Sequence, residues 1–162
     1  MTARLGCARC IALLPGLVAS LLTAEIAAAA CVAIASHPDG APLATYGLAA
    51  REPVFTVTYV HSVTLTPVEE RYRIDGSTMV ETVIRFEQHG PGLPTEADAG
   101  EQWTRRDGRF EVTMNRRFER IVMRVHAAQK PMLGIGPRNV DLAQWGNRAI
   151  ALSGSARPCA AP

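Results

Sequence analysis

The chain has 162 residues, with 17 basic and 15 acidic side chains and a formal net charge of +2. This length indicates one domain, and so balanced a charge argues against a nucleic-acid-binding surface. All but one of the basic residues are arginine, which we interpret as composition bias and not as phosphate recognition.

The first thirty residues have the order of an export signal. Arg4 and Arg9 give a basic start, an apolar run extends from Ile11 to Ala24, and small residues end at Ala30. The apolar run is shorter than the roughly 20 residues that span a bilayer. We therefore expect residues 1–30 to be a signal peptide and the protein to be periplasmic or otherwise extracytoplasmic. An uncleaved N-terminal anchor is the alternative.

The cysteines fall into two pairs. Cys7 and Cys10 lie in the segment that we expect to be removed, so we assign them no function. Cys31 and Cys159 remain, and in an oxidising compartment they can form a disulfide bond. Lipidation of Cys31 is the other possibility. Ala28 stands where a lipoprotein site usually has leucine, so we favour a soluble protein or the disulfide.

Apolar residues recur with a period of two within residues 31–155, which predicts a strand-rich domain followed by a tail at 156–162. The clearest strand is Phe55–Tyr59, and a first strand begins at Val32. Further strands are expected around 68–74, 80–86, 110–114, 121–125, 133–135, 140–142 and 149–152. Roughly eight short strands without a helical period predict an all-β sandwich or a partly open barrel.

The period of two also predicts which side chains share a face. Val80, Thr82, Ile84 and Phe86 are expected on one face of their strand. Glycine, proline and acidic residues predict a loop at 89–101.

His61 follows the clearest strand. Because alternate residues of a strand share a face, its side chain is expected to point inward with that of Tyr59. The same rule points Ser62 outward. A serine and a histidine on opposite faces cannot act together as nucleophile and base, so we assign no catalytic residue.

Glu70 lies on the apolar face of the next expected strand, with Val68 and Tyr72. With the hairpin turn placed at 64–67, we expect Glu70 to contact His61 or to share a water or backbone partner with it. The hydroxyls of Tyr59 and Tyr72 can join this network.

Two interpretations of this pair stay open. Either His61 and Glu70 line a pocket that binds a small molecule or metal or moves a proton, or they form a satisfied polar cluster that fixes the hairpin register. Even with His89 included, no pair has typical metal-ligand spacing, so we expect no metal and no cofactor.

The segment His-Gly-Pro-Gly-Leu-Pro at 89–94 is the second candidate motif. Its glycine amides could cradle an anion, although a Gly-Pro cluster more often reverses the chain. Downstream arginines at 105, 106, 109, 116, 117 and 120 offer an anionic-partner surface. The acids Glu96, Asp98 and Glu101 favour a mixed-charge face instead.

Two motifs carry a family resemblance. The run Tyr-Val-His-Ser-Val-Thr-Leu-Thr-Pro-Val-Glu-Glu from Tyr59, followed by a strand and then Gly-Pro-Gly-Leu-Pro from Gly90, resembles the bacterial exported domain-of-unknown-function family 1850. Its pattern is His-Ser-Val, Thr-Pro-Val, a Glu, and later Gly-Ala-Gly-Leu-Pro, fitted here from Cys31 to about Ser153. Pro91 replaces the alanine of the pattern, which weakens an anion cradle, and His89 replaces an aromatic residue.

Genes of this family are often beside, or fused to, membrane subunits of TAXI-type tripartite ATP-independent periplasmic (TRAP) transporters. The resemblance therefore implies an exported binding or accessory domain in solute uptake. Its partner would be the membrane subunit or its solute-binding protein, and it would meet the membrane only through that partner or an uncleaved anchor.

We expect the recognition site at one end of the β-structure, formed by His61, Ser62, Glu70, Gly90, Gly92, Leu93 and Pro94. The alternatives are a small hydrolase or isomerase that uses His61 and Glu70 as acid and base, and a structural envelope protein.

Overall fold

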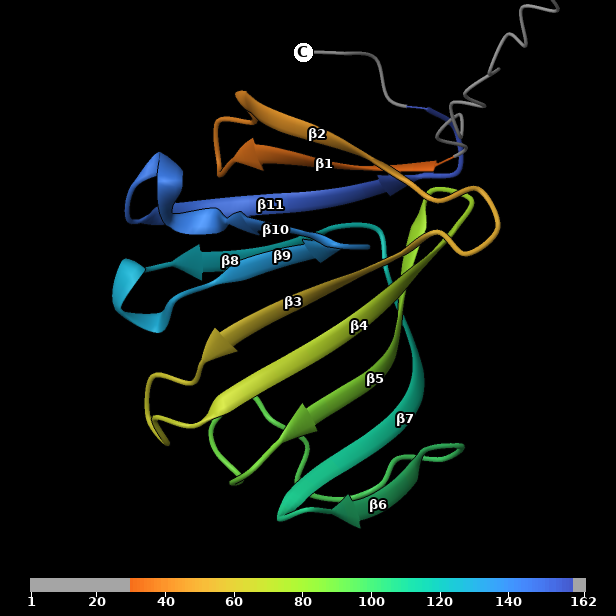
Figure 1. The fold of residues 1–162 in the computed structure, drawn as a ribbon, viewed down its shortest axis with the longest axis vertical. Helices are drawn as coiled ribbons and strands as arrows, with labels where there is room; N and C mark the ends of the chain where they lie inside the picture. The colour runs from red at the N-terminus through yellow and green to blue at the C-terminus, as the bar shows by residue number, and fades with distance from the viewer. Residues whose placement is uncertain (1–29, 159–162) are drawn as a thin grey trace, which may run out of the picture.

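The computed structural model describes residues 30–158 and places them in two antiparallel sheets that are not closed into a barrel (Figure 1). The four-stranded sheet has the order β2 (Pro42–Leu48), β1 (Ala30–Ser36), β11 (Arg148–Ser155) and β8 (Ile121–Val125). The expected all-β fold is confirmed.

The seven-stranded sheet contains the remaining strands and carries most of the site. Its order is β10 (Arg138–Asp141), β9 (Met132–Ile135), β3 (Val54–Val60), β4 (Pro67–Asp75), β5 (Thr78–Phe86), β7 (Arg109–Phe118) and β6 (Gln102–Arg106). Two short 3₁₀ turns, η1 (Ala127–Gln129) and η2 (Leu142–Trp145), flank β9 and β10. Of the described residues, none forms a helix that is long and apolar enough to cross a membrane.

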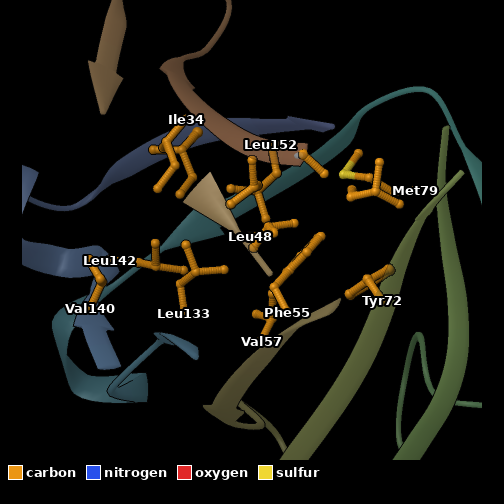
Figure 2. Packing of buried hydrophobic residues seen from close by; sticks show 14 of the residues in the cluster. Ile34, Leu48, Phe55, Val57, Tyr72, Met79, Leu133, Val140, Leu142 and Leu152 are labelled. Atoms are coloured by element: carbon orange, nitrogen blue, oxygen red, sulfur yellow. The ribbon is translucent and has the colours of Figure 1, made fainter. Parts of the chain in front are cut away.

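The main core lies between the facing sides of the two sheets (Figure 2). Ile34 and Leu152 reach it from the small sheet, and Phe55 and Met79 reach it from the large one. All four are at most 1% exposed. Burial of large apolar side chains such as these, at about 1.5–3 kcal/mol each, is what holds the two sheets together.

A β-bulge in β5 changes which of its residues face the core. Arg71 pairs with Val83, and the next residue of β4, Tyr72, pairs with Glu81, so Thr82 is the extra residue. The expected shared face of Val80 and Thr82 with Ile84 and Phe86 is therefore wrong. The bulge exchanges the two phases, and Met79 and Glu81 share the face of Ile84 and Phe86 instead.

A second, smaller apolar cluster lies where the large sheet extends beyond the small one. Val68, Ile84, Phe86 and Val112 contribute their inner-face side chains, and Leu93 covers them from the segment that joins β5 to β6. This segment, residues 87–101, folds back onto the part of the large sheet that the small sheet leaves uncovered. We call it the covering segment. The expected loop at 89–101 is confirmed as irregular structure.

The ends of the domain bear on two further expectations. Residues 1–29, nearly all of the expected signal peptide, lie outside the described residues. Cys31 is disulfide-bonded. Cys159, its expected partner, also lies outside the described residues, so that pairing stays a prediction.

Candidate functional site

A cavity of about 470 Å³ lies on the inner face of the large sheet, between the edge strand of the small sheet and the covering segment. β3, β4, β5 and β7 form its floor, β8 forms one wall, and Pro91–Pro94 form the other. Its volume falls in the range of pockets that hold small molecules, about 300–1,000 Å³.

Six of the seven residues expected from the sequence line this one cavity: His61, Ser62, Glu70, Gly92, Leu93 and Pro94. Gly90 lies behind the wall, where a β-carbon would be 2.8 Å from Cε1 of His61. Its lack of a side chain therefore lets the backbone approach the imidazole. The two motifs, separate in sequence, meet around one space.

Both ring nitrogens of His61 are used in hydrogen bonds. The backbone amides of Val63 and Thr64 donate to Nδ1 at 3.3 and 3.2 Å, and Nε2 donates to the carbonyl oxygen of Pro91 at 3.1 Å. The imidazole is therefore the Nε2–H tautomer. It closes the loop between β3 and β4 and ties that loop to the Gly90–Pro94 segment.

The expected contact between His61 and Glu70 does not form. Glu70 pairs with Val57, whereas His61 lies opposite Thr66 at the loop, where its amide donates to the Thr66 carbonyl at 2.9 Å. Four residues of strand separate the two positions, about 13 Å at the usual rise. The expectation was wrong because the loop spans 61–66 and not 64–67, which places Glu70 well away from the turn.

Glu70 is instead held by the two tyrosines that the sequence suggested as donors. The hydroxyl of Tyr59 donates to one carboxylate oxygen at 2.8 Å, and that of Tyr72 donates to the other at 2.7 Å. Burial raises the pKa of Glu70, and the two hydrogen bonds oppose that rise. The pKa values of both tyrosines are raised by burial and by the charge of Glu70, so their hydroxyls stay donors.

Glu81 is the main residue that the sequence reasoning missed. The bulge turns it into the cavity, where it is 6% exposed and accepts no hydrogen bond from any described residue. Burial first, and then the nearby charge of Glu70, raises its pKa to about 7. The one hint in the sequence is that β5 carries apolar residues in both phases, Met79 in one and Ile84 in the other, which indicates a phase change.

Arg116 lies across from Glu81 on β7, and its charge is already matched. Its guanidinium forms ion pairs with Asp98 and Glu101, each at 2.8 Å, and the Glu101 side chain is 5% exposed. Arg116 acts on Glu81 only through its charge, which opposes the rise in pKa. The arginine thus anchors the covering segment to the sheet, and Glu81 keeps no close cationic partner.

The wall formed by the end of β7 and by β8 is mainly apolar. Phe118, Ile121 and Met123 line it, and Arg124 and His126 lie at the rim with exposed side chains. Polar groups on the floor and apolar groups on the wall make the cavity amphipathic.

His89 stands outside the cavity. Its Nδ1 lies 2.9 Å from the Pro94 carbonyl, and its ring packs on Phe86, Trp103 and Phe110. His89 therefore fixes the covering segment from the other side. No group of three or more His, Cys, Asp or Glu residues within 30–158 is arranged to hold a metal ion.

Fold and site together define a small two-sheet β-domain with a cavity bordered by two loop motifs. A comparison with protein families matches residues 55–142 to Domain of unknown function (DUF1850). The chain belongs to this family.

The match is narrower than the resemblance fitted from Cys31 to about Ser153, and it leaves out β1, β2 and β11. All residues that line the cavity fall inside it. Searches of curated proteins and of solved structures find no match.

Proposed function

We propose that this protein is an exported binding domain that serves as an accessory of a TAXI-type TRAP solute-uptake system. Its partner is the membrane subunit or the solute-binding protein of that system, and it acts in the periplasm or another extracytoplasmic compartment. The family resemblance supports the transporter link. The signal-like segment at 1–30 supports export.

The observation that carries the binding role is the convergence of both family motifs on one cavity. His61 and Ser62 come from the loop after β3, and Gly92, Leu93 and Pro94 come from the covering segment. The hydrogen bond from His61 to Pro91 couples the two pieces. A motif that served only the fold would not need both pieces to border an open space.

Exposed apolar side chains at the same place support contact with a protein partner. Val63 and Leu65 are 65% and 73% exposed at the tip of the loop that begins with His61, and Val122 is 47% exposed on β8. Each sits on an element that borders the cavity. Single exposed apolar residues are ordinary, but two neighbours at the tip of a loop that borders the cavity, and a third that lines it, suit a docking surface.

The test is a capture assay with the transporter membrane subunit. Gly92→Phe is expected to abolish capture, because Gly92 lines the cavity and a bulky side chain there blocks its mouth. Gly108→Phe is the matched control. Both glycines have positive φ, +84° and +78°, and open space at the β-carbon, so the backbone strain is alike, but Gly108 lies in the β6–β7 turn.

Equal capture by the wild-type protein and by Gly92→Phe would remove the covering segment from the interface. Loss of capture in both variants would point to backbone strain and would also contradict the proposal. Far-ultraviolet circular dichroism of each variant checks that the sheets remain.

The enzyme alternative required His61 and Glu70 to work as an acid–base pair. The register separates them, and both nitrogens of His61 are engaged with the backbone. A structural envelope protein would show no dependence of binding on Gly92.

A further inference from the structure

The carboxylate of Glu81 has no hydrogen-bond or ion-pair partner among the described residues. The residue is 6% exposed and lines the cavity, and its carboxylate oxygens, which are open to that cavity, accept no hydrogen bond from a described residue. An ionised carboxylate that is largely removed from water and has no partner is unfavourable, so such a group either keeps its proton or pairs with a ligand. Glu70 next to it has both oxygens satisfied by tyrosines, so Glu81 is the open acceptor of the site.

The charges around the cavity select the sign of a ligand. Glu70 and Glu81 bring carboxylates to the floor, the charge of Glu101 acts on Glu81 from nearby, and the guanidinium of Arg116 is already shared between Glu101 and Asp98. A bound anion would meet Glu70 and Glu81 on the floor, where no free cation lies, because Arg124, the lining arginine that forms no ion pair with a described residue, is exposed at the rim. A neutral ligand would leave Glu81 without a counter-charge. A cation is the ligand that satisfies the floor.

The walls select the body of that cation. Phe118, Ile121 and Met123 present apolar surface on the β8 side, and Leu93 does so opposite. A hydrated inorganic ion gains nothing from such walls, whereas an apolar group attached to the charge buries its surface against them. The ring of Phe118 also suits a neighbouring cation.

We propose that the cavity binds a small organic cation, a primary ammonium group on an apolar body, with the ammonium donating to Glu81 and the body lying along Phe118, Ile121 and Met123. An ammonium has three donors and no acceptor, which complements a carboxylate that lacks donors. The inference rests on the proposed function, because it takes this cavity as the binding site of an exported binding domain.

Isothermal titration calorimetry on protein purified from cells that express the full chain tests this. The probe is 2-phenylethylammonium, with 2-phenylethanol as its neutral match and 3-phenylpropanoate as its anionic match. At about pH 8.5 Glu81 is ionised and an alkylammonium is still protonated. Saturable binding of the ammonium at concentrations up to about 10 mM, and none of the two matched compounds, is the expected result.

Two variants locate the site. Glu81→Gln is expected to weaken binding of the ammonium by about tenfold or more, because it removes a buried charge partner. Glu119→Gln, at an exposed position outside the cavity, is expected to leave the affinity unchanged. Circular dichroism and a denaturant titration confirm that both variants fold.

Three results would overturn the inference: no saturable binding of the ammonium, equal or tighter binding of 3-phenylpropanoate, or unchanged binding in Glu81→Gln. Calcium chloride that binds in place of the ammonium would overturn it too, since the walls would then play no part. Because no transporter subunit is present, failure here leaves the capture assay to decide the proposed function separately.

Discussion

At the scale of single residues, two glutamates that line the same cavity have different partners. Glu70 is satisfied by two tyrosine hydroxyls, and Glu81 accepts no hydrogen bond within residues 30–158. Burial raises both pKa values, but only Glu70 has hydrogen bonds that oppose the rise. An ionised Glu81 lowers the stability of the empty fold, and the same charge attracts a cationic ligand. Glu81 therefore has opposite effects on stability and on ligand binding.

Glu81 should make the fold less stable as the pH rises. Its pKa is raised from 4.5 in the unfolded chain to about 7 in the fold, so the folded state holds the proton more tightly. Its stabilising contribution to the free energy of unfolding is fully present below pH 4.5 and is lost as the pH rises through about 7. The loss is roughly 3 kcal/mol at most. Urea denaturation should show that Glu81→Gln lessens the fall in free energy of unfolding between about pH 5 and 8.

Glu70 also has a raised pKa, so some pH dependence will remain in the variant. Wild-type protein and Glu81→Gln with the same difference between the two pH values would contradict the argument. Glu119→Gln, at an exposed position outside the cavity, again serves as the control variant.

At the scale of elements, the site depends on where the strands end and on the β-bulge that shifts the register of one of them. His61 is placed by the loop after β3, and Glu81 by the bulge in β5. The linkage between His61 and the Pro91 carbonyl joins the β3–β4 loop to the covering segment. This single hydrogen bond couples two elements that are far apart along the chain.

His61→Asn should separate the two roles of the imidazole. An asparagine oxygen can still accept from the amides of Val63 and Thr64, as in an Asx turn, but it is too short to reach Pro91. The covering segment then opens more often, and the amide of Leu93, which donates to Gly90, exchanges faster by about fivefold for the loss of one hydrogen bond.

Hydrogen–deuterium exchange measures this effect, with amides at the centre of β4 as the internal reference. Protection of Leu93 that is unchanged in His61→Asn would show that the aromatic packing of His89 and the ion pairs of Arg116 hold the segment without His61. Protection lost across β4 as well would indicate general unfolding.

The strands could largely be predicted from the sequence, and the register could not. Strands such as β3 and β4 alternate cleanly because one face meets the core, whereas β2 has little alternation and β6 is a mostly exposed polar edge strand, so neither was predicted. The bulge at Thr82 and the length of the 61–66 loop depend on cross-strand pairing, which a single strand does not encode. Glu81 was missed and His61 was wrongly paired for this reason.

At the scale of the whole molecule, the two apolar clusters have different supports. The main core is held from both sides by sheets, while the second is closed by a loop residue, Leu93. The cavity lies between the two, where the cover changes from β8 to the covering segment. Stability should therefore be concentrated on the side of the small sheet.

Truncations in the two clusters should differ in cost. Leu152→Ala in the main core is fully buried between sheets and is expected to lower the free energy of unfolding by about 3–5 kcal/mol. Leu93→Ala should cost only about 2 kcal/mol, because the loop around it can relax into the space. Guanidinium denaturation at one pH compares the two. A larger loss for Leu93→Ala would reverse the assignment of the stabilising core.

The pairing of β1 with β11 has a practical consequence for handling the protein. Cys31 lies opposite Ser155, so both ends of the described chain leave from one side, while β3 and β8 run out on the other (Figure 1). An affinity tag or a fused fluorescent protein joined after the last described residue would therefore start on the side of the domain opposite the ends of β3 and β8. A molecule immobilised through such a tag would expose the cavity, whose lining includes Ser62 and His126, to a binding partner in solution.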